Sequence, residues 1–563
     1  MLSRLTLNSP PRWLQSLNRL GLEDLWTWGV GAIAIVVATP VFAVLVNLVQ
    51  GSSSIWQHLV ETVLADYIAH SFILMVGVGL AVLILGTGTA WLVTMCRFPG
   101  SRILEWLLLL PLASPAYLLA YIYTEFLDYY GPVQLTLRQW FGWQSAQDYW
   151  FPDIRSMGGA IVLLALTLYP YVYLLARVAF LEQSTRTLEA SRSLGCSPWR
   201  AFWQVALPLA RPSLAAGLAL ALMETLNDFG TVQFFGITTF TTGIYRTWLG
   251  MGERAAASQL AALLLLFIGV LIALERWSRR QVRYYQNSAH TQPFQPYQLK
   301  PMQAGGAAIA CGLPVVLGFV LPLVLIIQMT LTNTTESFTA EFWELARNTL
   351  LLAVLTAILG MVVALVLAYG QRLRPTWSMG LFVRLAAMGY AIPGSVIAVG
   401  ILLPLGQLDN WLAKGLADQF GLSVGLLFSG TIFALLFAYL VRFLALSFNT
   451  VESSLGKIQP TLDEASRSLG QSPLQTLVKV HVPLLRGGVM TAMMLLFVDV
   501  MKELPATLVI RPFNFETLAT QVYRYAADER LVEAAAPALA ILAVGLIPVI
   551  FLTMQVARSR TVA

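Results

Sequence analysis

The sequence has very few charged residues for its length. Of its 563 residues only 11% are charged, whereas 57% are hydrophobic, and the mean hydropathy is +0.70. Soluble globular proteins carry about 25% charged residues, so this composition excludes an ordinary soluble globule. The net charge of +6 is spread over many loops and forms no basic stripe, so no nucleic-acid partner is expected.

Cysteine and histidine are also scarce, which limits the chemistry that the chain can perform. The three cysteines (Cys96, Cys196 and Cys311) imply no disulfide framework. The four histidines (His58, His70, His290 and His481) have no metal-ligand spacing, which argues against a zinc site. No combination of nucleophile, base and metal ligands is visible, so a membrane-embedded enzyme is the least favoured class.

A phosphate-binding loop of the form G-x-x-x-x-G-K-[ST] is absent. The one Gly-Lys pair, Gly456-Lys457, continues to Ile458 and so lacks the motif. The chain is therefore not expected to hydrolyse ATP itself.

Long apolar stretches, in contrast, recur along the whole sequence. A helix needs about 20 mostly apolar residues to cross a bilayer core. The sequence predicts an all-α transmembrane fold with twelve spans, over 26–50, 72–95, 103–126, 158–181, 212–235, 257–275, 304–330, 348–370, 381–405, 424–448, 486–508 and 534–556. The first span is too long for the apolar part of a cleavable signal, and residues 1–25 before it read as an amphipathic segment at the membrane surface.

Lys and Arg residues indicate the orientation of these spans. They gather at the N-terminus, after the second and fourth spans, and in the segment after the sixth span, which places those loops and both termini in the cytoplasm. Most Lys and Arg residues follow this positive-inside distribution. Five arginines are exceptions, because they fall in loops on the outer side (Arg246, Arg254, Arg511, Arg524 and Arg530).

The chain reads as two halves. The polar, proline-bearing segment 276–303 separates six spans from six and is predicted to be a cytoplasmic linker. The expected division is an N-terminal segment 1–25, a first half 26–275, the linker, a second half 304–556 and a tail 557–563. The heptapeptide EASRSLG occurs at 189–195 and again 275 positions later at 464–470. Because each half has an even number of spans, both copies face the cytoplasm.

The repeated segment has the features of a short helix that ends at a glycine. In the second copy Thr461 and Glu464 have the spacing of a capping box, and Arg467 can pair with Glu464. Gly470 supplies the residue that most easily takes the left-handed conformation after a helix. A hairpin that only packs on the bundle would not require identical side chains, so the identity favours two identical partners bound symmetrically.

These residues resemble the EAA loop of the permease subunits of ATP-binding-cassette importers. The loop consists of Glu-Ala-Ala, a glycine three residues after the triplet and a later Leu-Pro or Val-Pro. The matching residues are Glu189, Ala190, Ser191, Gly195 and Leu207-Pro208 in the first copy, and Glu464, Ala465, Ser466, Gly470 and Val482-Pro483 in the second. Both copies depart from the pattern in having Ser in place of the second Ala.

The resemblance implies a fused type I importer permease in a bacterial inner membrane. In that family the loop is a coupling helix that docks on an ATPase subunit, so two ATPase subunits that bind ATP and Mg²⁺ are implied as partners, together with a periplasmic binding protein. The chain itself would be a transport subunit surrounded by membrane lipid. An ATP-independent secondary transporter is the alternative of a different class, and it would not need two docking helices.

Four acidic residues in the fifth and eleventh spans are candidates for the substrate pathway. Glu224 and Asp499 each lie 13 residues past an arginine, which is about 20 Å into an apolar core of about 30 Å. Asp228 and Glu503 follow them by four residues, which on a helix puts each pair on one face. Charged side chains within a span are costly, so they are functional candidates.

If the halves pack about a pseudo-two-fold axis, these four carboxylates would line one pathway and suit a hard cation, as possible metal ligands. The alternative interpretation is that Lys502, adjacent to Glu503, neutralises part of this charge and that the acids are packing or gating pairs.

A further resemblance concerns the substrate. The segments METLNDFGTVQFFG at 223–236 and KELPATLVIRPFNFETLATQVY at 502–523 look like those of ferric-iron importer permeases. This implies Fe(III) as the transported ion, delivered by a periplasmic ferric-iron-binding protein. Permeases for polyamines, phosphonates, thiamine or sulfate share the scaffold and are the alternatives of the same class.

Overall fold

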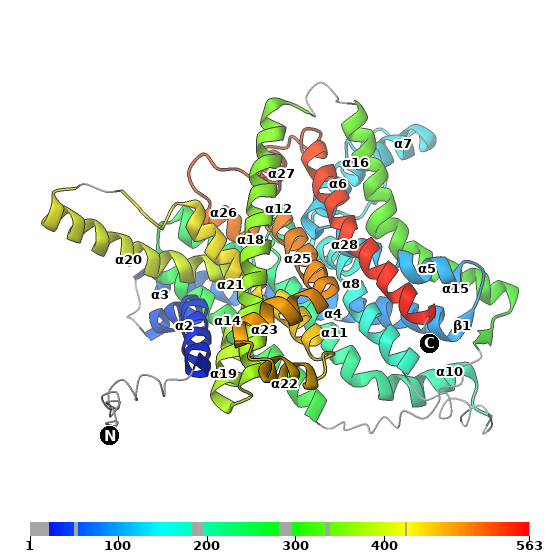
Figure 1. The fold of residues 1–563 in the computed structure, drawn as a ribbon. Coiled ribbons are helices and arrows are strands. Elements are labelled where there is room, and N and C mark those ends of the chain that lie inside the picture. Colours follow the sequence, from blue (N-terminus) through cyan, green and yellow to red (C-terminus); the bar gives the residue numbers. More distant parts are fainter. Residues whose placement is uncertain are drawn as a thin grey trace, which may run out of the picture. The chain divides into compact units, whose positions relative to one another are not determined.

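The computed structural model of the chain describes residues 22–49, 54–182, 191, 193, 195–280, 296–332, 338–422 and 425–561. Most of these residues are helical, so the predicted all-α class is confirmed (Figure 1). Within this described part, the strands are two residues each: β1 (Cys96–Arg97) runs parallel to β2 (Tyr297–Gln298).

The first half of the chain contains α2 (Leu22–Val49), α3 (Ser54–Thr62), α4 (Leu64–Met95), α5 (Ser101–Leu107), α6 (Ala116–Leu127), α7 (Pro132–Phe141), α8 (Met157–Glu182), α10 (Pro198–Ala201), α11 (Leu207–Asn227), α12 (Gly230–Phe234), α13 (Phe240–Tyr245) and α14 (Arg254–Arg280). Three short helical turns of other types lie among them: η1 (Leu110–Ala113), η2 (Phe202–Ala206) and η3 (Arg246–Gly250).

The second half contains α15 (Pro301–Val315), α16 (Leu321–Thr332), α18 (Ala340–Leu373), α19 (Trp377–Ala386), α20 (Gly394–Phe420), α21 (Ile432–Leu455), α22 (Thr461–Ser468), α23 (Pro473–Thr476), α24 (Val482–Leu484), α25 (Arg486–Met501), α26 (Pro505–Ile510), α27 (Leu518–Ala527) and α28 (Ala535–Thr561). Its short turns are η4 (Val316–Val320), η5 (Gly389–Ala391) and η6 (Leu477–His481).

Most of the predicted spans coincide with long apolar helices. The described residues contain nine helices that are long and apolar enough to cross a membrane, or up to eleven if each of two bent pairs is one span. The bent pairs, at 92° and 82°, fall on the predicted spans 103–126 and 486–508. The predicted span 534–556 falls on α28, whose apolar part, Ala535–Phe551, is shorter than the other spans.

Proline positions explain several irregular turns in these helices. The π-helical turns η2, η4 and η6 each end two residues before a proline (Pro208, Pro322 and Pro483). Proline has no N–H group and its ring collides with the carbonyl four residues earlier, so a wider turn just before it relieves both problems. The bend in the third predicted span has a related cause, because Pro115 is the N-cap of α6, just as Pro393 is the N-cap of α20.

The internal contacts divide the chain into two compact units, and these units are not the two sequence halves. One unit comprises Met1–Thr39, Val354–Tyr390 and Tyr439–Phe497, and the other comprises Pro40–Ala353, Ala391–Ala438 and Val498–Ala563. Each unit therefore contains segments of both halves.

The first helices of each half pack on helices of the other half, which explains part of this mixing of the two halves. In the smaller unit, α2 packs on second-half helices: a Cβ added to Gly370 of α18 would lie 2.8 Å from Val30 Cγ2. In the larger unit, second-half helices α15 and α16 lie against first-half helices, and the Tyr123 hydroxyl donates a hydrogen bond to the Leu317 carbonyl (2.6 Å). Each half therefore relies on a helix of the other half for part of its packing.

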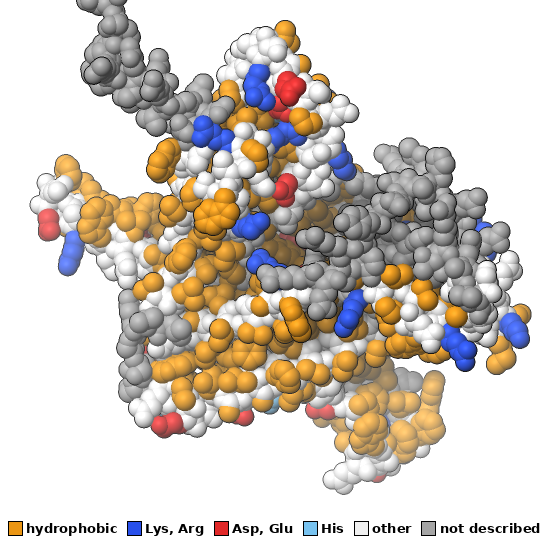
Figure 2. All heavy atoms as spheres, turned by 90° about the horizontal axis from the view of Figure 1, so that it is seen from below, with side chains coloured by type: hydrophobic (Ala, Val, Ile, Leu, Met, Phe, Trp, Pro, Cys, Tyr) orange, Lys and Arg blue, Asp and Glu red, His pale blue; other side chains and the backbone are white. Residues whose placement is uncertain are grey.

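Apolar side chains are also abundant on the surface. Figure 2 shows hydrophobic side chains over much of the visible face. Helix α4 exposes Phe72, Ile73, Val76, Leu80 and Ile84, and α16 exposes Val324, Ile327 and Leu331. Exposed apolar surface on this scale is stable when lipid, not water, surrounds the helices.

Candidate functional site

The second EASRSLG segment forms α22 and the turn that follows. The helix begins at Thr461, as the sequence predicts. The predicted capping box is wrong, because Thr461 is already the first helical residue and its side chain makes no capping bond. Instead the carbonyl of Pro460 accepts the N–H groups of Asp463 and Glu464 (3.0 and 3.2 Å). At the other end Gly470 takes the predicted left-handed conformation, with φ at +73°.

The side chains of α22 divide into an exposed and a buried set. Glu464 and Ala465 are exposed, whereas Ser466 is buried. The Ser466 hydroxyl lies 2.8 Å from the Thr476 hydroxyl at the end of α23, and the two form a hydrogen bond. Serine in place of the second alanine of the motif is thus small enough for helix packing and adds one polar contact. Glu464 remains free to face another molecule.

Asp463, next to Glu464, fixes α22 to the helices behind it. Its carboxylate accepts hydrogen bonds from Arg372 Nη2 and Nε (2.6 and 3.0 Å) and lies 2.7 Å from His481 Nε2. Arg372 also donates to the carbonyls of Leu455 and Ile458 at the end of α21 (2.6 and 2.9 Å). One guanidinium therefore joins α18, α21 and α22.

The same contacts act on the ionisation of Asp463. Burial raises the pKa of this carboxyl, but the hydrogen bonds from Arg372 and His481 and their charges outweigh burial, so its pKa lies below the ordinary value of 3.8. Asp463 is accordingly ionised at neutral pH and holds Arg372 by a partly buried ion pair.

The sequence did not predict this anchor. The residues 275 positions before Arg372, Asp463 and His481 are Arg97, Leu188 and Ala206, so the first half lacks the acid and the histidine. Because the three residues come from three separate helices, no local spacing marks them. The difference between the halves at these positions was the only available signal.

The first EASRSLG segment is described only in part. Glu189 and Ala190 lie outside the described residues, whereas Ser191 is buried, like Ser466. The Cys196 N–H donates to the Ser191 carbonyl (3.0 Å), and the Gln471 N–H donates to the Ser466 carbonyl in the same way (3.1 Å). With Gly195 at φ +80°, the turn after the helix has the same geometry in both copies.

Two of the four predicted pathway acids lie at helix breaks. The prediction that each pair of acids shares one helical face is wrong, because α11 ends at Asn227 and α25 ends at Met501. Asp228 Oδ2 accepts the Val232 N–H (3.1 Å), and Glu503 Oε1 accepts the Ala506 N–H (3.0 Å). Each acid thereby satisfies a free N–H group at the start of the short helix that follows, α12 or α26.

The other two acids have partners three residues later in the chain. Glu224 Oε2 lies 3.5 Å from Asn227 Nδ2, and Asp499 Oδ1 lies 2.8 Å from Lys502 Nζ. Lys502 also interacts electrostatically with Glu224. The alternative interpretation, that Lys502 neutralises part of the acidic charge, is thus confirmed for Asp499.

A resident metal site is not formed by these acids. Within the described part of the chain, no three His, Cys, Asp or Glu side chains are grouped so that they could hold a metal ion. A role of the four acids along a transport pathway stays a prediction.

Two equivalent short helices follow the helix breaks, α13 in the first half and α27 in the second. Each begins with a pair of threonines that cap it reciprocally, Thr239 with Thr242 and Thr517 with Thr520, 278 positions apart. The first N–H of each helix donates to a hydroxyl of a long helix: Phe240 to Ser71 (3.4 Å) and Leu518 to Thr349 (2.9 Å). The internal repeat therefore extends to individual hydrogen bonds.

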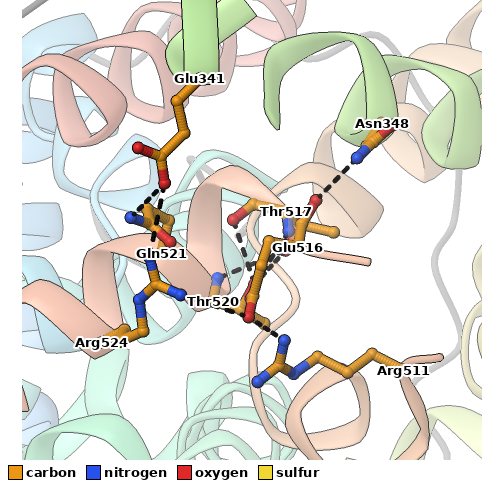
Figure 3. Close-up of polar contacts among 8 residues, drawn as sticks. All are labelled: Glu341, Asn348, Arg511, Glu516, Thr517, Thr520, Gln521 and Arg524. Carbon is orange, nitrogen blue, oxygen red and sulfur yellow. Dashed lines mark hydrogen bonds and ion pairs between the residues drawn. The ribbon is translucent and has the colours of Figure 1, made fainter. Parts of the chain in front are cut away.

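The second-half copy adds a network of charged side chains (Figure 3). Glu516 accepts hydrogen bonds from Arg511 and from the Thr520 hydroxyl (2.7 Å), and its carbonyl accepts one from Asn348 (3.2 Å). Arg524 lies 3.4 Å from Glu341. Two of the arginines that depart from the predicted charge rule, Arg511 and Arg524, are thus paired with acids.

Two equivalent tyrosines from these helices contact each other. Tyr245 ends α13, and Tyr523, 278 positions later, lies in α27. Their hydroxyls are hydrogen-bonded, and both rings pack on Phe229, with ring centroids 4.6 and 5.7 Å away. The similar tripeptides of the two halves, IYR at 244–246 and VYR at 522–524, therefore meet through their tyrosines.

Comparison with known proteins gives one family and several relatives. The family described as "Binding-protein-dependent transport system inner membrane component" matches residues 82–284 and 357–561. The Fe(3+)-transport system permease protein FbpB 2 of Haemophilus influenzae is 26% identical over 497 residues, which cover 87% of this chain and 90% of that protein.

Permeases for other substrates match a smaller share of this chain. The molybdenum transport system permease protein ModB of Escherichia coli is 27% identical over 34% of this chain and 82% of its own length. The sulfate transport system permease protein CysT of Escherichia coli is 30% identical over 35% of this chain and 72% of its own length.

Proposed function

Since the chain belongs to the family of binding-protein-dependent transport system inner membrane components, and carries the family's domain twice, we propose that it is the permease of an ATP-driven importer of ferric iron. The two domains and the helical structure give it the predicted type I permease fold. It is a multi-pass membrane protein and a transport subunit, as are the relatives.

The observation that supports ferric iron as the substrate is the share of this chain that matches an iron permease. An iron permease resembles 87% of this chain, including both halves, whereas a molybdenum permease resembles 34% of it and two sulfate permeases resemble 35% and 50% of it. Two further iron permeases, of Haemophilus influenzae and Actinobacillus pleuropneumoniae, match 83% and 71% of the chain. Fe(III) is accordingly the proposed cargo, and a periplasmic ferric-iron-binding protein is the proposed donor.

The proposed partners on the other side are two copies of an ATPase subunit that bind ATP and Mg²⁺. Exposed Glu464 and the repeated turn geometry at Gly195 and Gly470 support docking through the two EASRSLG segments. In this proposal Glu189, Ala190 and Ser191 with Gly195, and Glu464, Ala465 and Ser466 with Gly470, form the two coupling surfaces. ATP-driven closure of the ATPases would then move the helices that follow each segment and switch the access of the pathway.

We also propose the arrangement of the chain in the membrane. Both termini, the linker 276–303 and the two coupling segments lie in the cytoplasm, and the halves 26–275 and 304–556 cross the inner membrane in the same direction. The distribution of Lys and Arg supports this orientation.

The test is uptake by proteoliposomes that contain the chain, its ATPase and its binding protein. ATP-dependent accumulation of radiolabelled Fe(III), without accumulation of molybdate or sulfate, is the expected result. Accumulation of another cargo, such as molybdate, sulfate, a polyamine, a phosphonate or thiamine, would replace iron as the substrate. Uptake that is equally fast without ATP would contradict the importer class itself.

A paired variant tests the acids in the same assay. Glu224→Gln with Asp499→Asn is expected to lower iron uptake while ATPase assembly stays intact, whereas Glu344→Gln, an exposed acid on α18, is the control and should leave uptake unchanged. Undiminished uptake by the paired variant would remove these two acids from the path.

A further inference from the structure

Asp228, at the first helix break, has room for one more hydrogen bond or ligand. An ionised carboxylate has about four lone-pair positions. Asp228 accepts hydrogen bonds from the Val232 N–H (3.1 Å) and the Thr231 hydroxyl (2.9 Å), and from the Thr231 N–H. Each carboxylate is held in place by the backbone of the next helix, so its position is fixed before any ligand arrives.

Two tyrosines of α6 bring further oxygen atoms to this region. Tyr117 and Tyr121 are 6% and 3% exposed, and within the described structure their hydroxyls have no hydrogen-bond partner. A buried hydroxyl without a partner is energetically unfavourable, because it has given up its hydrogen bonds to water. A ligand that binds beside these hydroxyls is one way to satisfy them.

Contacts place these tyrosines beside the breaks of both halves. A Cβ added to Gly230, the first residue of α12, would lie 2.5 Å from Tyr117 Cβ and 3.0 Å from Leu504 Cδ2, just before α26. Tyr117 interacts electrostatically with Glu503, and Tyr121 with Asp228. The start of α6, the start of α12 and the start of α26 therefore meet at one point.

The local charge selects the kind of ligand. Four acidic residues, Glu224, Asp228, Asp499 and Glu503, stand against one lysine, Lys502, in these segments. An oxyanion such as molybdate or sulfate would be repelled by this excess of carboxylates, whereas a small, highly charged cation prefers carboxylate and other oxygen ligands.

We propose that Tyr117, Tyr121, Asp228 and Glu503 form an oxygen-lined transit site that the hard trivalent cation occupies on its way through the permease. This inference rests on the proposed function, since it assumes an Fe(III) cargo. Each tyrosine that binds the ion loses its hydroxyl proton to water released from the hydration shell, so binding forms an oxygen–iron bond without any change of redox state.

The experiment uses the full chain in lipid nanodiscs with Fe(III) citrate as the probe. A phenolate bound to Fe(III) absorbs visible light through ligand-to-metal charge transfer, which iron on carboxylates alone does not. The variants are Tyr117→Phe, Tyr121→Phe and the double variant. Tyr169→Phe is the matched control, because Tyr169 is also buried with a hydroxyl that lacks a partner in the described structure, but lies on α8.

We expect wild type and Tyr169→Phe to develop the absorption band, each single variant to lose at least half of it and the double variant to lose it. ATP-driven iron uptake in the complete importer should fall about tenfold in the double variant, which is about 1.4 kcal/mol in the free energy of the limiting step. Asp228→Asn, which still accepts the Val232 N–H and so keeps the helix break, should also lower uptake.

Iron uptake and absorption in the double variant equal to those of wild type would overturn the transit site and leave the iron importer standing. Wild-type transport of molybdate or sulfate but not iron would overturn both. If the double variant does not assemble with its ATPase, the two single variants and Asp228→Asn test the transit site in its place. Iron uptake at the wild-type level in all three would overturn the site.

Discussion

Neighbouring acids on α22 have different tasks. Asp463 points into the protein and holds Arg372 and His481, whereas Glu464 is exposed and has the position that the resemblance assigns to ATPase docking. A carboxylate that is buried with its partners contributes to folding, and an exposed one is available to another subunit.

Substitution of these two acids should separate stability from coupling. Asp463→Ala leaves the half-buried Arg372 guanidinium without its acid and is expected to lower the free energy of unfolding by about 1–2 kcal/mol. Glu464→Ala should leave stability unchanged and lower ATP-dependent uptake. Thermal unfolding in detergent and proteoliposome uptake measure the two effects; equal stability of both variants would contradict the anchor.

The ionisation of Asp463 also predicts a pH dependence. Its pKa is lower in the folded protein than the ordinary 3.8, so its contribution to stability is complete above about pH 4 and is lost as the pH falls through the lower value. The difference in melting temperature between wild type and Asp463→Asn should therefore be present at pH 5 and shrink as the pH falls below about 4. A difference that persists unchanged in strong acid would count against this assignment.

At the scale of elements, the turns after the EASRSLG helices depend on backbone conformation. Gly195 and Gly470 have φ of +80° and +73°, yet a Cβ added to either would meet nothing within 4 Å. The glycines are therefore needed because L-residues are strained at positive φ, and not because the site is crowded.

Replacement of Gly470 should reveal this strain. Gly470→Val is expected to lower ATP-dependent uptake severalfold, since a β-branched residue at positive φ costs about 1–2 kcal/mol and shifts α22. Gly470→Asn, which tolerates the left-handed region, should keep most of the activity. Equal uptake by the two variants, measured at matched protein levels, would show that the conformation does not matter.

The junction of α12 with α6 is limited by space. A Cβ on Gly230 would lie 2.5 Å from Tyr117 Cβ, so Gly230→Ala must displace one helix and should destabilise the protein by about 1–3 kcal/mol. Gly269→Ala on α14, where a Cβ meets nothing within 4 Å, is the control and should be neutral or stabilising. Thermal unfolding of both variants measures the difference in stability. Similar stabilities would mean that α6 and α12 can move apart at little cost, which would contradict the prediction.

For the whole molecule, the exchange of first helices makes each half depend on the other. α2 packs on α18, and α15 and α16 pack on helices of the first half. A fused chain guarantees that these partners are made in equal number, which two separate half-size permeases would have to achieve by association.

A cut in the linker tests this dependence. Two polypeptides, 1–288 and 289–563, should co-purify and restore iron uptake when they are expressed together, because the packing between halves does not require the covalent link. Either polypeptide expressed alone should be degraded, since the surface that receives the exchanged helix is left uncovered. A stable, monomeric first half would contradict the exchange.

The sequence alone determined the class and the repeat. Apolar stretches, the duplicated EASRSLG and the positions of Gly195 and Gly470 depend on local composition and backbone preference, which a sequence contains directly. Tertiary structure decided which distant groups meet. The Asp463–Arg372–His481 anchor, the pairing of Tyr245 with Tyr523 and the meeting of Tyr117 with both helix breaks join residues from separate helices.

The four acids show the boundary between the two. The spacing of the acids from the preceding arginines predicted how deep they lie in the membrane. The prediction that each pair shares one helical face assumed that the helix continues through both acids. Instead, α11 and α25 end before Asp228 and Glu503. A carboxylate can accept hydrogen bonds from the N–H groups of the next helix only if its own helix has ended, so the two arrangements compete. Which arrangement has the lower free energy is settled by the packing of α12 and α26, and local spacing contains no information about that packing.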